Sequence, residues 1–409
     1  GVKAAPPSGG WGALACTCPF RPKPCWHALA LAQLFEKQPD AFTEVADLPD
    51  WATALLAGDA APMRRTASPE TKAAEKQKRR FERLERTAAG FDDLENWLAD
   101  TARRGLATVV AEDPKFYETI AARVADASMT SLSRQLRLLG QIRTTEPDWA
   151  ERMLAVLADA HLAVRSFRQR ENLPEALLHD LQNFIGIATQ KDEVLAAGER
   201  VADIWAVLAV REDMIENGLA GRRTWLFGGK TGRMAVVQEY AFLSAAPFAP
   251  GFRVGDVLRG EAVFYPSAFP LRVLLEGAEV LPRKVEKMPG YADFQLFAQD
   301  FAKSVGQQPW LTAAGQAGFP AAFEAVVPVF SDEKFWLMDE AGRQLPLAVR
   351  ESGGWQMLAL SGGQAVGVFG EWDGAALTVL SVAAAGRLVP MPGFRVSGSG
   401  RDAILLPAV

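Results

Sequence analysis

The twelve residues 16–27, CTCPFRPKPCWH, hold every cysteine of this 409-residue chain and one of its three histidines. Metal binding requires donor atoms that converge on one point, so the spacing of these residues matters more than their number. Cys16 and Cys18 are two positions apart, and on an extended strand such residues share a face, so both thiolates can reach one ion. Residues 11–18 (WGALACTC) predict that strand, and the proline-rich residues 19–24 must then turn the chain back.

Cys25 and His27 form the second pair of donors. Inside a regular helix, residues two positions apart point about 200° away from each other, so this pair can share an ion only where it straddles a helix start. Pro24 and the apolar, alanine-rich stretch after His27 predict such a start. The expected unit is a hairpin followed by a helix, in which Cys16, Cys18, Cys25 and His27 bind one Zn²⁺ tetrahedrally. A site filled by four protein ligands is closed and structural, with no open position for catalysis.

Other interpretations of the cluster fit the residues less well. A Cys16–Cys18 disulfide would close a very small, strained ring, and three cysteines in so long a chain fit a reducing compartment. Iron–sulfur and copper centres also use thiolates, but three thiolates and one imidazole favour zinc. Chance clustering would leave unexplained why cysteine is absent from the rest of the chain.

The pattern CxCx6CxH, followed directly by ALAL at 28–31, resembles the SWIM zinc finger over residues 11–35. The rest of the chain is similar to a group of bacterial SWIM-containing proteins, in which a helical region and a Trp-rich β region follow the finger. The stretches RRTWL at 222–226 and FYP at 264–266 resemble recurring stretches of that group. The resemblance implies partners among MoxR-type AAA ATPases and von Willebrand A-domain proteins.

The beginning of the chain departs from that group. Its relatives have strand-forming residues ahead of the finger, whereas here about ten glycine- and proline-rich residues precede it, and the sequence starts Gly-Val rather than Met. We therefore expect a truncated N-terminus.

Composition sets the broad class. The length predicts two or three domains, and no apolar run approaches the roughly 18 to 20 residues that span a bilayer. With no signal pattern either, we expect a cytoplasmic protein. The net charge of −5 and the pI near 5.5 argue against binding nucleic acid through overall charge, so such binding would need a local basic patch.

One segment supplies a candidate patch. Residues 36–69 predict a linker, Ser68-Pro69-Glu70 predicts a helix start, and apolar residues then recur at helical spacing to about 104. Between residues 64 and 86, nine basic residues against four acidic ones leave a local charge of +5. Five of them recur on the side opposite the apolar stripe: Lys72, Lys76, Arg79, Arg83 and Arg86. The simpler interpretation is a solvated helix face with Glu–Arg pairs such as Glu82–Arg86.

The remaining chain divides into a helical and a β-rich part. Helical periodicity predicts an α-helical domain over 70–220, whose last stripe contains Val194, Val201, Ile204, Trp205 and Leu208. Short apolar runs separated by glycine turns predict an antiparallel β-rich domain over 221–409, with a helical insert near 291–305. The runs expected to be strands include GWQMLAL at 354–360.

The stretch GGKTG at 228–232 invites a phosphate-loop interpretation. That motif requires a glycine at position 224, which is a threonine here, and the bulky residues 225–227 occupy the place of the cradle. A hairpin turn is the better prediction. We find no other catalytic motif, and His161 and His179 have no second histidine or cysteine nearby, so we expect no enzyme activity.

Together these observations predict an α+β multidomain protein: a zinc-bound finger (1–35), a linker (36–69), a helical domain and a β-rich domain. We expect a protein-interaction adaptor. The alternative is a DNA- or RNA-binding protein that uses the finger and the basic 64–86 face. Arg21 and Lys23 lie in the ligand-to-ligand loop of the finger, where their charge could meet phosphate or an acidic protein face.

Overall fold

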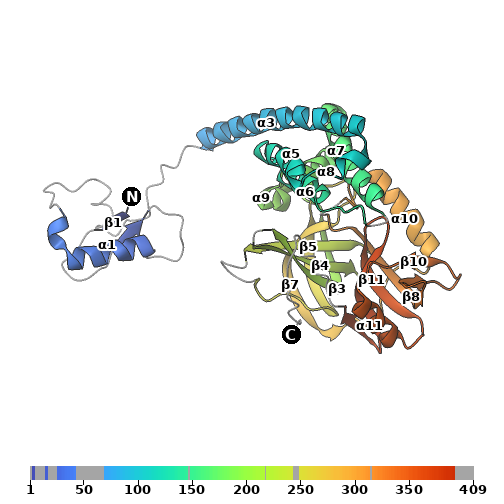
Figure 1. Ribbon diagram of the computed structural model, residues 1–409. Coiled ribbons are helices and arrows are strands. Elements are labelled where there is room, and N and C mark those ends of the chain that lie inside the picture. Colours follow the sequence, from blue (N-terminus) through green and yellow to red (C-terminus); the bar gives the residue numbers. More distant parts are fainter. Residues whose placement is uncertain are drawn as a thin grey trace. The chain divides into compact units, whose positions relative to one another are not determined.

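The computed structural model describes residues 2–4, 14–16, 25–42, 69–145, 148–216, 218–242, 248–313 and 316–391 (Figure 1). The chain divides into two compact units, Gly1–Phe81 and Glu82–Val409, which we treat separately.

The first unit is a short hairpin followed by a helix. The sequence predicts the strand within 11–18 and the helix after residue 25, but not β1, which lies in the stretch before the finger. Strands β1 (Val2–Ala4) and β2 (Leu14–Cys16) pair antiparallel, with Val2 opposite Cys16. Helix α1 (Trp26–Lys37) packs against both strands through a face that buries Ala28 and Ala32. Small residues on that face allow the helix to approach the strands closely. A single 3₁₀ turn, η1 (Pro39–Ala41), follows it.

The second unit begins with a bundle of helices whose apolar stripes meet in one core. The rings of Phe91 and Phe167, from the first and fifth of these helices, stack with their centroids 4.5 Å apart. Helices α5, α6, α7 and α8 lie on one side of the strands (Figure 1). The helices are α3 (Pro69–Arg104), α4 (Leu106–Val109), α5 (Pro114–Asp126), α6 (Thr130–Leu139), α7 (Trp149–Arg168), the 3₁₀ turn η2 (Arg170–Asn172), α8 (Glu175–Ile185) and α9 (Lys191–Ala197).

The prediction of helix up to residue 220 is wrong beyond α9, because β3 occupies Arg200–Glu216. Burial alternates over residues 202–207, but Val207, Leu208 and Ala209 are all buried, so the alternation that marks a half-exposed strand breaks in the middle of β3. Trp205 and Val207 point into one core while Leu208 and Ala209 pack in another, and a register shift against β4 falls between Val207 and Ala209. The resulting spacing of apolar residues imitates a helical stripe.

Five strands close into a barrel in the order β3-β4-β5-β7-β6. All neighbours pair antiparallel except β5 and β7, which are parallel. This order and these directions are those of the five-stranded Greek-key barrel called the OB fold. The further strands are β4 (Leu219–Gly228), β5 (Met234–Phe242), β6 (Asp256–Phe264) and β7 (Arg272–Lys284).

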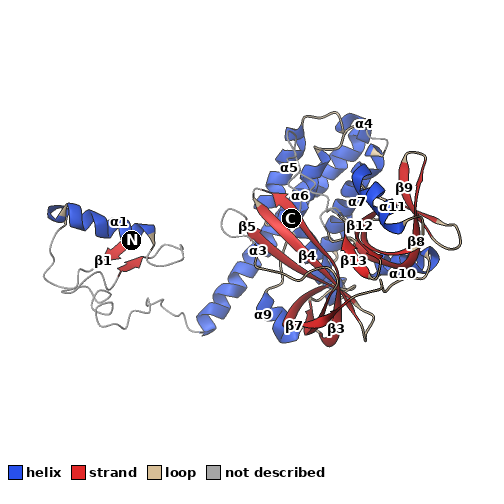
Figure 2. Ribbon diagram, turned by 90° about the horizontal axis from the view of Figure 1, so that it is seen from below, coloured by secondary structure: helices blue, strands red, loops and turns tan. Residues whose placement is uncertain are grey.

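A six-stranded antiparallel sheet packs beside the barrel in the order β10-β9-β8-β11-β12-β13 (Figure 2). Its strands are β8 (Phe319–Ser331), β9 (Lys334–Met338), β10 (Gln344–Pro346), β11 (Val366–Trp372), β12 (Leu377–Ala384) and β13 (Arg387–Pro390). Helix α10 (Phe294–Gln307) lies between barrel and sheet in sequence, where the sequence predicts a helical insert.

The stretch GWQMLAL is helical rather than a strand. Helix α11 (Glu351–Ser361) packs on β8 and β12 and buries Met357 completely. Gly354 is required there, since a Cβ would lie 2.4 Å from the ring of Phe335. A short apolar run does not distinguish a strand from a helix packed on a sheet, which explains the error.

The helices, the barrel and the sheet of the second unit are joined by apolar clusters to which more than one of them contributes. Trp225 of β4 packs in the same cluster as Phe369 of β11, which joins barrel to sheet. Trp310, from the segment after α10, stacks on Phe184 of α8 with centroids 5.2 Å apart, which joins that segment to the helices. Within the described ranges, no helix combines the length and apolar composition needed to cross a membrane.

Candidate zinc finger and binding surfaces

The finger places its second pair of donors around a helix start, as predicted. Cys25 is the residue before α1, with an extended backbone (φ −80°, ψ 165°), and its carbonyl accepts the first helical hydrogen bond from Leu29 at 3.0 Å. His27 is the second helical residue. Cys25 is buried at 1% exposure, whereas His27 is exposed.

Cys16 is the last residue of β2, which packs against α1. Three of the four predicted ligand positions, Cys16, Cys25 and His27, therefore belong to elements that contact each other. A strand end and a helix start that lie against each other suit a tetrahedral Cys₃His site. The side chain of Cys16 and all of Cys18, Arg21 and Lys23 fall outside the described part of the chain. Among the side chains that are described, no group of three His, Cys, Asp or Glu is arranged to hold a metal.

Helix α1 also presents an apolar face away from the hairpin. Trp26, Leu29 and Leu34 are 74%, 40% and 45% exposed. At 100° per residue these side chains lie within one half of the helix surface, opposite Ala28 and Ala32. Exposed single leucines are common, but an exposed tryptophan beside two leucines is the composition of a contact surface. The position between Cys25 and His27 is variable in the motif, so the sequence pattern does not mark Trp26 as a contact residue.

The predicted basic face lies on one uninterrupted helix. Lys72, Lys76, Arg79, Arg83 and Arg86 are all within α3, at steps of three and four residues. The backbone therefore places them along one side of the helix. Of these five side chains the structure describes that of Arg86, which is exposed and engaged in an interaction.

The GGKTG turn joins β4 to β5, as predicted for a hairpin. The Asp203 carboxylate accepts hydrogen bonds from the amides of Lys230 and Thr231, both at 3.0 Å, and from the Thr231 hydroxyl at 2.7 Å. Burial alone would raise the pKa of Asp203, but these hydrogen bonds outweigh burial and lower it. The amides that would cradle a phosphate thus hold a carboxylate of the protein.

The stretch RRTWL has a structural role. Arg222, 6% exposed, donates to Glu239 at 2.8 Å and to the carbonyl of Ala249 at 2.9 Å. Arg223 donates to Asp213 at 2.9 Å and to Glu371 at 3.2 Å. These ion pairs connect β4 to both neighbouring strands, β3 and β5, and to β11 of the sheet.

The aromatic rings of FYP support arginines in the same way. The guanidinium carbon of Arg233 lies 3.9 Å from the ring centroid of Phe264, and that of Arg272 lies 4.2 Å from the ring of Tyr265. Such cation–π contacts fix the direction of both arginine side chains.

A hairpin followed by a helix, with Cys16 at the strand end and Cys25 and His27 at the helix start, is the arrangement typical of a zinc finger. The comparison with family models names the particular kind. Residues 12–35 match the SWIM zinc finger, and residues 82–185 match the SWIM-associated four-helix bundle domain. The chain therefore carries a SWIM zinc finger, a zinc-binding module, together with its associated helical domain, and the expected resemblance to SWIM-containing proteins is confirmed over these two ranges. The partner classes implied by that resemblance stay a prediction. Comparison with curated proteins and with solved structures found no significant match.

Proposed function

We propose that this chain is an adaptor whose zinc finger docks on a protein partner through the exposed face of α1. The observation that carries the proposal is the 74% exposure of Trp26 between two zinc-ligand positions. Tryptophan is among the residues most enriched at the energetic centres of protein interfaces, because it buries a large rigid surface at low entropic cost. We propose a binding role rather than a catalytic one.

The charge of the α1 face supports a protein rather than a nucleic acid as partner. Trp26, Leu29 and Leu34 share it with the exposed Gln33 and with Lys37 as its basic residue. Nucleic-acid surfaces are recognised by clusters of lysine and arginine, since neutralising phosphates supplies most of the affinity. An apolar helix face instead suits a hydrophobic groove on a protein.

Zinc would hold this face in place. One ion bound by Cys16, Cys18, Cys25 and His27 would fix the direction of the first turn of α1, and Trp26 lies in that turn. Structural zinc contributes folding free energy directly in units too small to fold by burial alone. Loss of zinc should therefore abolish docking without touching the contact surface.

The first partners to test are MoxR-type AAA ATPases and von Willebrand A-domain proteins, the classes implied by the SWIM resemblance. The tagged chain is used to capture proteins from its native host, with and without nuclease, and the Trp26→Ala variant is compared with the unaltered chain. We expect a captured protein to survive nuclease and high salt, and Trp26→Ala to weaken its binding by about tenfold or more.

Leu154→Ala is the matched control, because Leu154 on α7 is 56% exposed and lies outside the finger. It should bind as the unaltered chain does. Equal capture by Trp26→Ala, or capture that disappears with nuclease, would overturn the proposal.

A second candidate is nucleic-acid binding through α3. It is supported by the placement of Lys72, Lys76, Arg79, Arg83 and Arg86 along one uninterrupted helix. Affinity for DNA or RNA should then fall steeply as salt increases and be lost when Arg79, Arg83 and Arg86 are changed to glutamate. The absence of any shift of a labelled oligonucleotide at low salt would exclude this candidate.

A further inference from the structure

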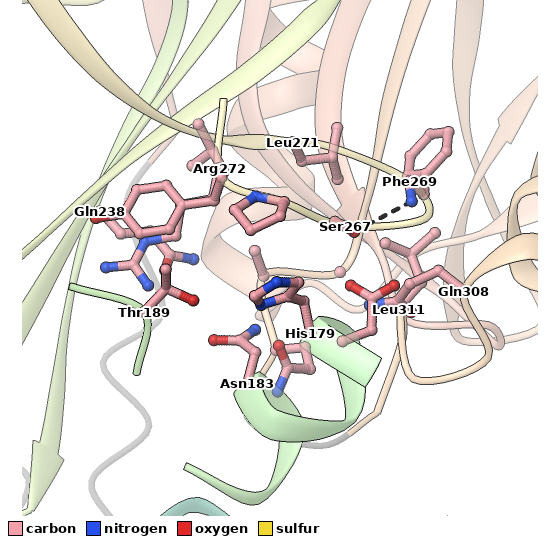
Figure 3. Close-up of a pocket in the computed structure, with 17 residues that line it drawn as sticks. His179, Asn183, Thr189, Gln238, Ser267, Phe269, Leu271, Arg272, Gln308 and Leu311 are labelled. Carbon is pink, nitrogen blue, oxygen red and sulfur yellow. Dashed lines mark hydrogen bonds between the residues drawn. The ribbon is translucent and has the colours of Figure 1, made fainter. Parts of the chain in front are cut away.

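A polar pocket lies where the helices meet the barrel (Figure 3). Its lining comes from α8 and Thr189, from β5, from the loop 265–271 with Arg272 at the start of β7, and from residues after α10 within 308–311 and 316–318. In Figure 3 the ring of His179 lies centrally, with Arg272 and Gln308 on opposite sides of it. The cavity measures about 80 Å³, enough for a ligand of a few heavy atoms.

One side of this pocket is anchored by a buried acid. Asp180, 4% exposed, accepts a hydrogen bond from the amide of Ala268 at 2.8 Å. Burial raises the pKa of Asp180, an effect that hydrogen bonds from Ser267 and Gln308 and the nearby His179 only partly offset. The carboxyl group therefore lacks a strong cationic partner among the residues around it.

The same side holds polar atoms that have no partner. Gln308 is 8% exposed, and its side-chain oxygen forms no hydrogen bond; the Nδ1 atom of His179 is likewise buried without a partner. A buried polar atom left unpaired costs about 1 to 3 kcal/mol, so such atoms call for an explanation. A ligand that donates hydrogen bonds would satisfy the glutamine oxygen.

The opposite side carries a positive charge. Arg272 is half-buried against the ring of Tyr265 and forms no ion pair with any residue that the structure describes. A guanidinium held against an aromatic ring keeps its donors in a fixed plane, which suits a planar carboxylate.

The position of the pocket matches the topology. OB barrels bind their ligands on the face of the second and third strands and on the loop between the fourth and fifth. Those elements correspond here to β4, β5 and the loop 265–271, and β5 and the loop both line the pocket. The outer face of β4 is covered by the six-stranded sheet, since Trp225 donates a hydrogen bond to Glu371 of β11. Room is left for a small molecule, not for an extended chain.

We propose that this pocket binds a small zwitterion of the amino-acid type. Its carboxylate pairs with Arg272, and its ammonium group donates to the unpaired side-chain oxygen of Gln308, beside Asp180. The amides of Asn183 and Gln238, which also line the pocket, can contact the ligand's side chain. This site lies in the second unit and is independent of the finger and of its docking role.

Calorimetric titration of the full chain with a panel of L-amino acids tests the proposal. We expect at least one to bind with a Kd below about 1 mM, and acetate and ethylamine, which each carry one of the two charges, to bind at least tenfold more weakly. Arg272→Gln should weaken the amino acid at least tenfold, Arg272→Lys should weaken it less, and Gln308→Leu should also weaken it.

Arg259→Gln is the matched control, because Arg259 is an exposed arginine of the same barrel, paired with Glu279 outside the pocket. It should bind as the unaltered chain does. Thermal unfolding of each variant confirms that it is folded, and Arg272→Lys keeps the test valid should Arg272→Gln unfold. No binding by any L-amino acid, or equal binding by Arg272→Gln and Arg259→Gln, would overturn the proposal.

Discussion

The indole N–H of Trp225 on β4 donates a 2.8 Å hydrogen bond to the carboxylate of Glu371 on β11. These residues lie 146 positions apart and join the barrel to the six-stranded sheet. The same carboxylate accepts from Arg211 at 2.8 Å and from Arg223 at 3.2 Å, and Asp213 accepts from both arginines. One buried carboxylate on β11 thus binds side chains of both β3 and β4 at the junction of barrel and sheet.

Replacing Glu371 with alanine should destabilise the second unit strongly. The change removes one of the two carboxylates that pair with Arg211 and Arg223, and it removes the acceptor of the buried Trp225 indole. Asp213 remains as a partner of both arginines, and a buried donor left without an acceptor costs about 1 to 3 kcal/mol. Urea unfolding monitored by circular dichroism measures the effect. Glu279→Ala breaks an ion pair whose side chains are both 64% exposed and should cost less than about 1 kcal/mol. Similar losses in the two variants would contradict this role for Glu371.

Asp203, not Lys230, should maintain the turn between β4 and β5. Asp203→Ala leaves two amides and a hydroxyl without their acceptor and should cost about 1 to 3 kcal/mol. Because the pKa of Asp203 is lowered in the fold, its contribution is complete above pH 4 or so and is lost as the pH falls through the folded pKa. Thermal unfolding between pH 2 and pH 7 should show that loss.

Lys230→Ala is the control for the turn, because the side chain of Lys230 is exposed. A phosphate loop would lose nucleotide binding in this variant, whereas a hairpin turn should show no change in stability. A nucleotide-dependent rise in melting temperature that Lys230→Ala abolishes would restore the phosphate-loop interpretation.

Asp159 should make the stability of the second unit depend on pH with the sign opposite to that expected for Asp203. Burial raises its pKa to about 6, above the unfolded value of about 4. The folded state therefore holds the proton more tightly, and this contribution to stability is complete below pH 4 and lost as the pH rises through 6. The side chain of the Asp159→Asn variant cannot ionise. As the pH rises from 4 to 8, the free energy of unfolding of the variant should therefore increase by about 1 to 2 kcal/mol relative to that of the unaltered chain. Parallel stability curves for the two proteins would disprove the assignment.

Two helical glycines should respond in opposite directions to alanine. At Gly90 of α3 a Cβ would lie 2.3 Å from the Cβ of Ala127, so Gly90→Ala must push the helices apart and should cost about 1 to 3 kcal/mol. At Gly306 of α10 no atom lies within 4 Å, and Gly306→Ala should stabilise by up to about 1 kcal/mol. Chemical denaturation of both variants measures the difference, and destabilisation by Gly306→Ala would contradict the open space found around Gly306.

Local signals in the sequence predicted the elements whose determinants lie close together along the chain. The proline and apolar residues around Cys25 mark the start of α1, and the GGKTG stretch at 228–232 marks the hairpin of β4 and β5. The prediction failed where distant residues decide. Strand β3 looks helical because each of its faces is covered by a different core, and α11 is a helix because Met357 and Gly354 pack on β8 and β9.

The candidate functional residues also divide into those that local sequence predicts and those that only the fold brings together. Cys25 and His27 are recognisable because the SWIM zinc-finger motif fixes their spacing. The exposure of Trp26 depends on which face of α1 meets the hairpin, and the pocket brings together His179, Arg272 and Gln308 from three distant segments. No local spacing relates those three residues, so only the fold reveals them.

The most direct test of the account is the zinc content of the purified chain, measured by atomic emission for the unaltered protein and for a Cys25→Ser, His27→Ala double variant. His161→Ala serves as the control, since His161 is an exposed histidine on α7. A closed Cys₃His finger predicts about one zinc per chain in the unaltered protein and the control, and a loss of most of it in the double variant. Equal zinc content in all three proteins, or none in any, would contradict the finger on which the proposed docking surface depends.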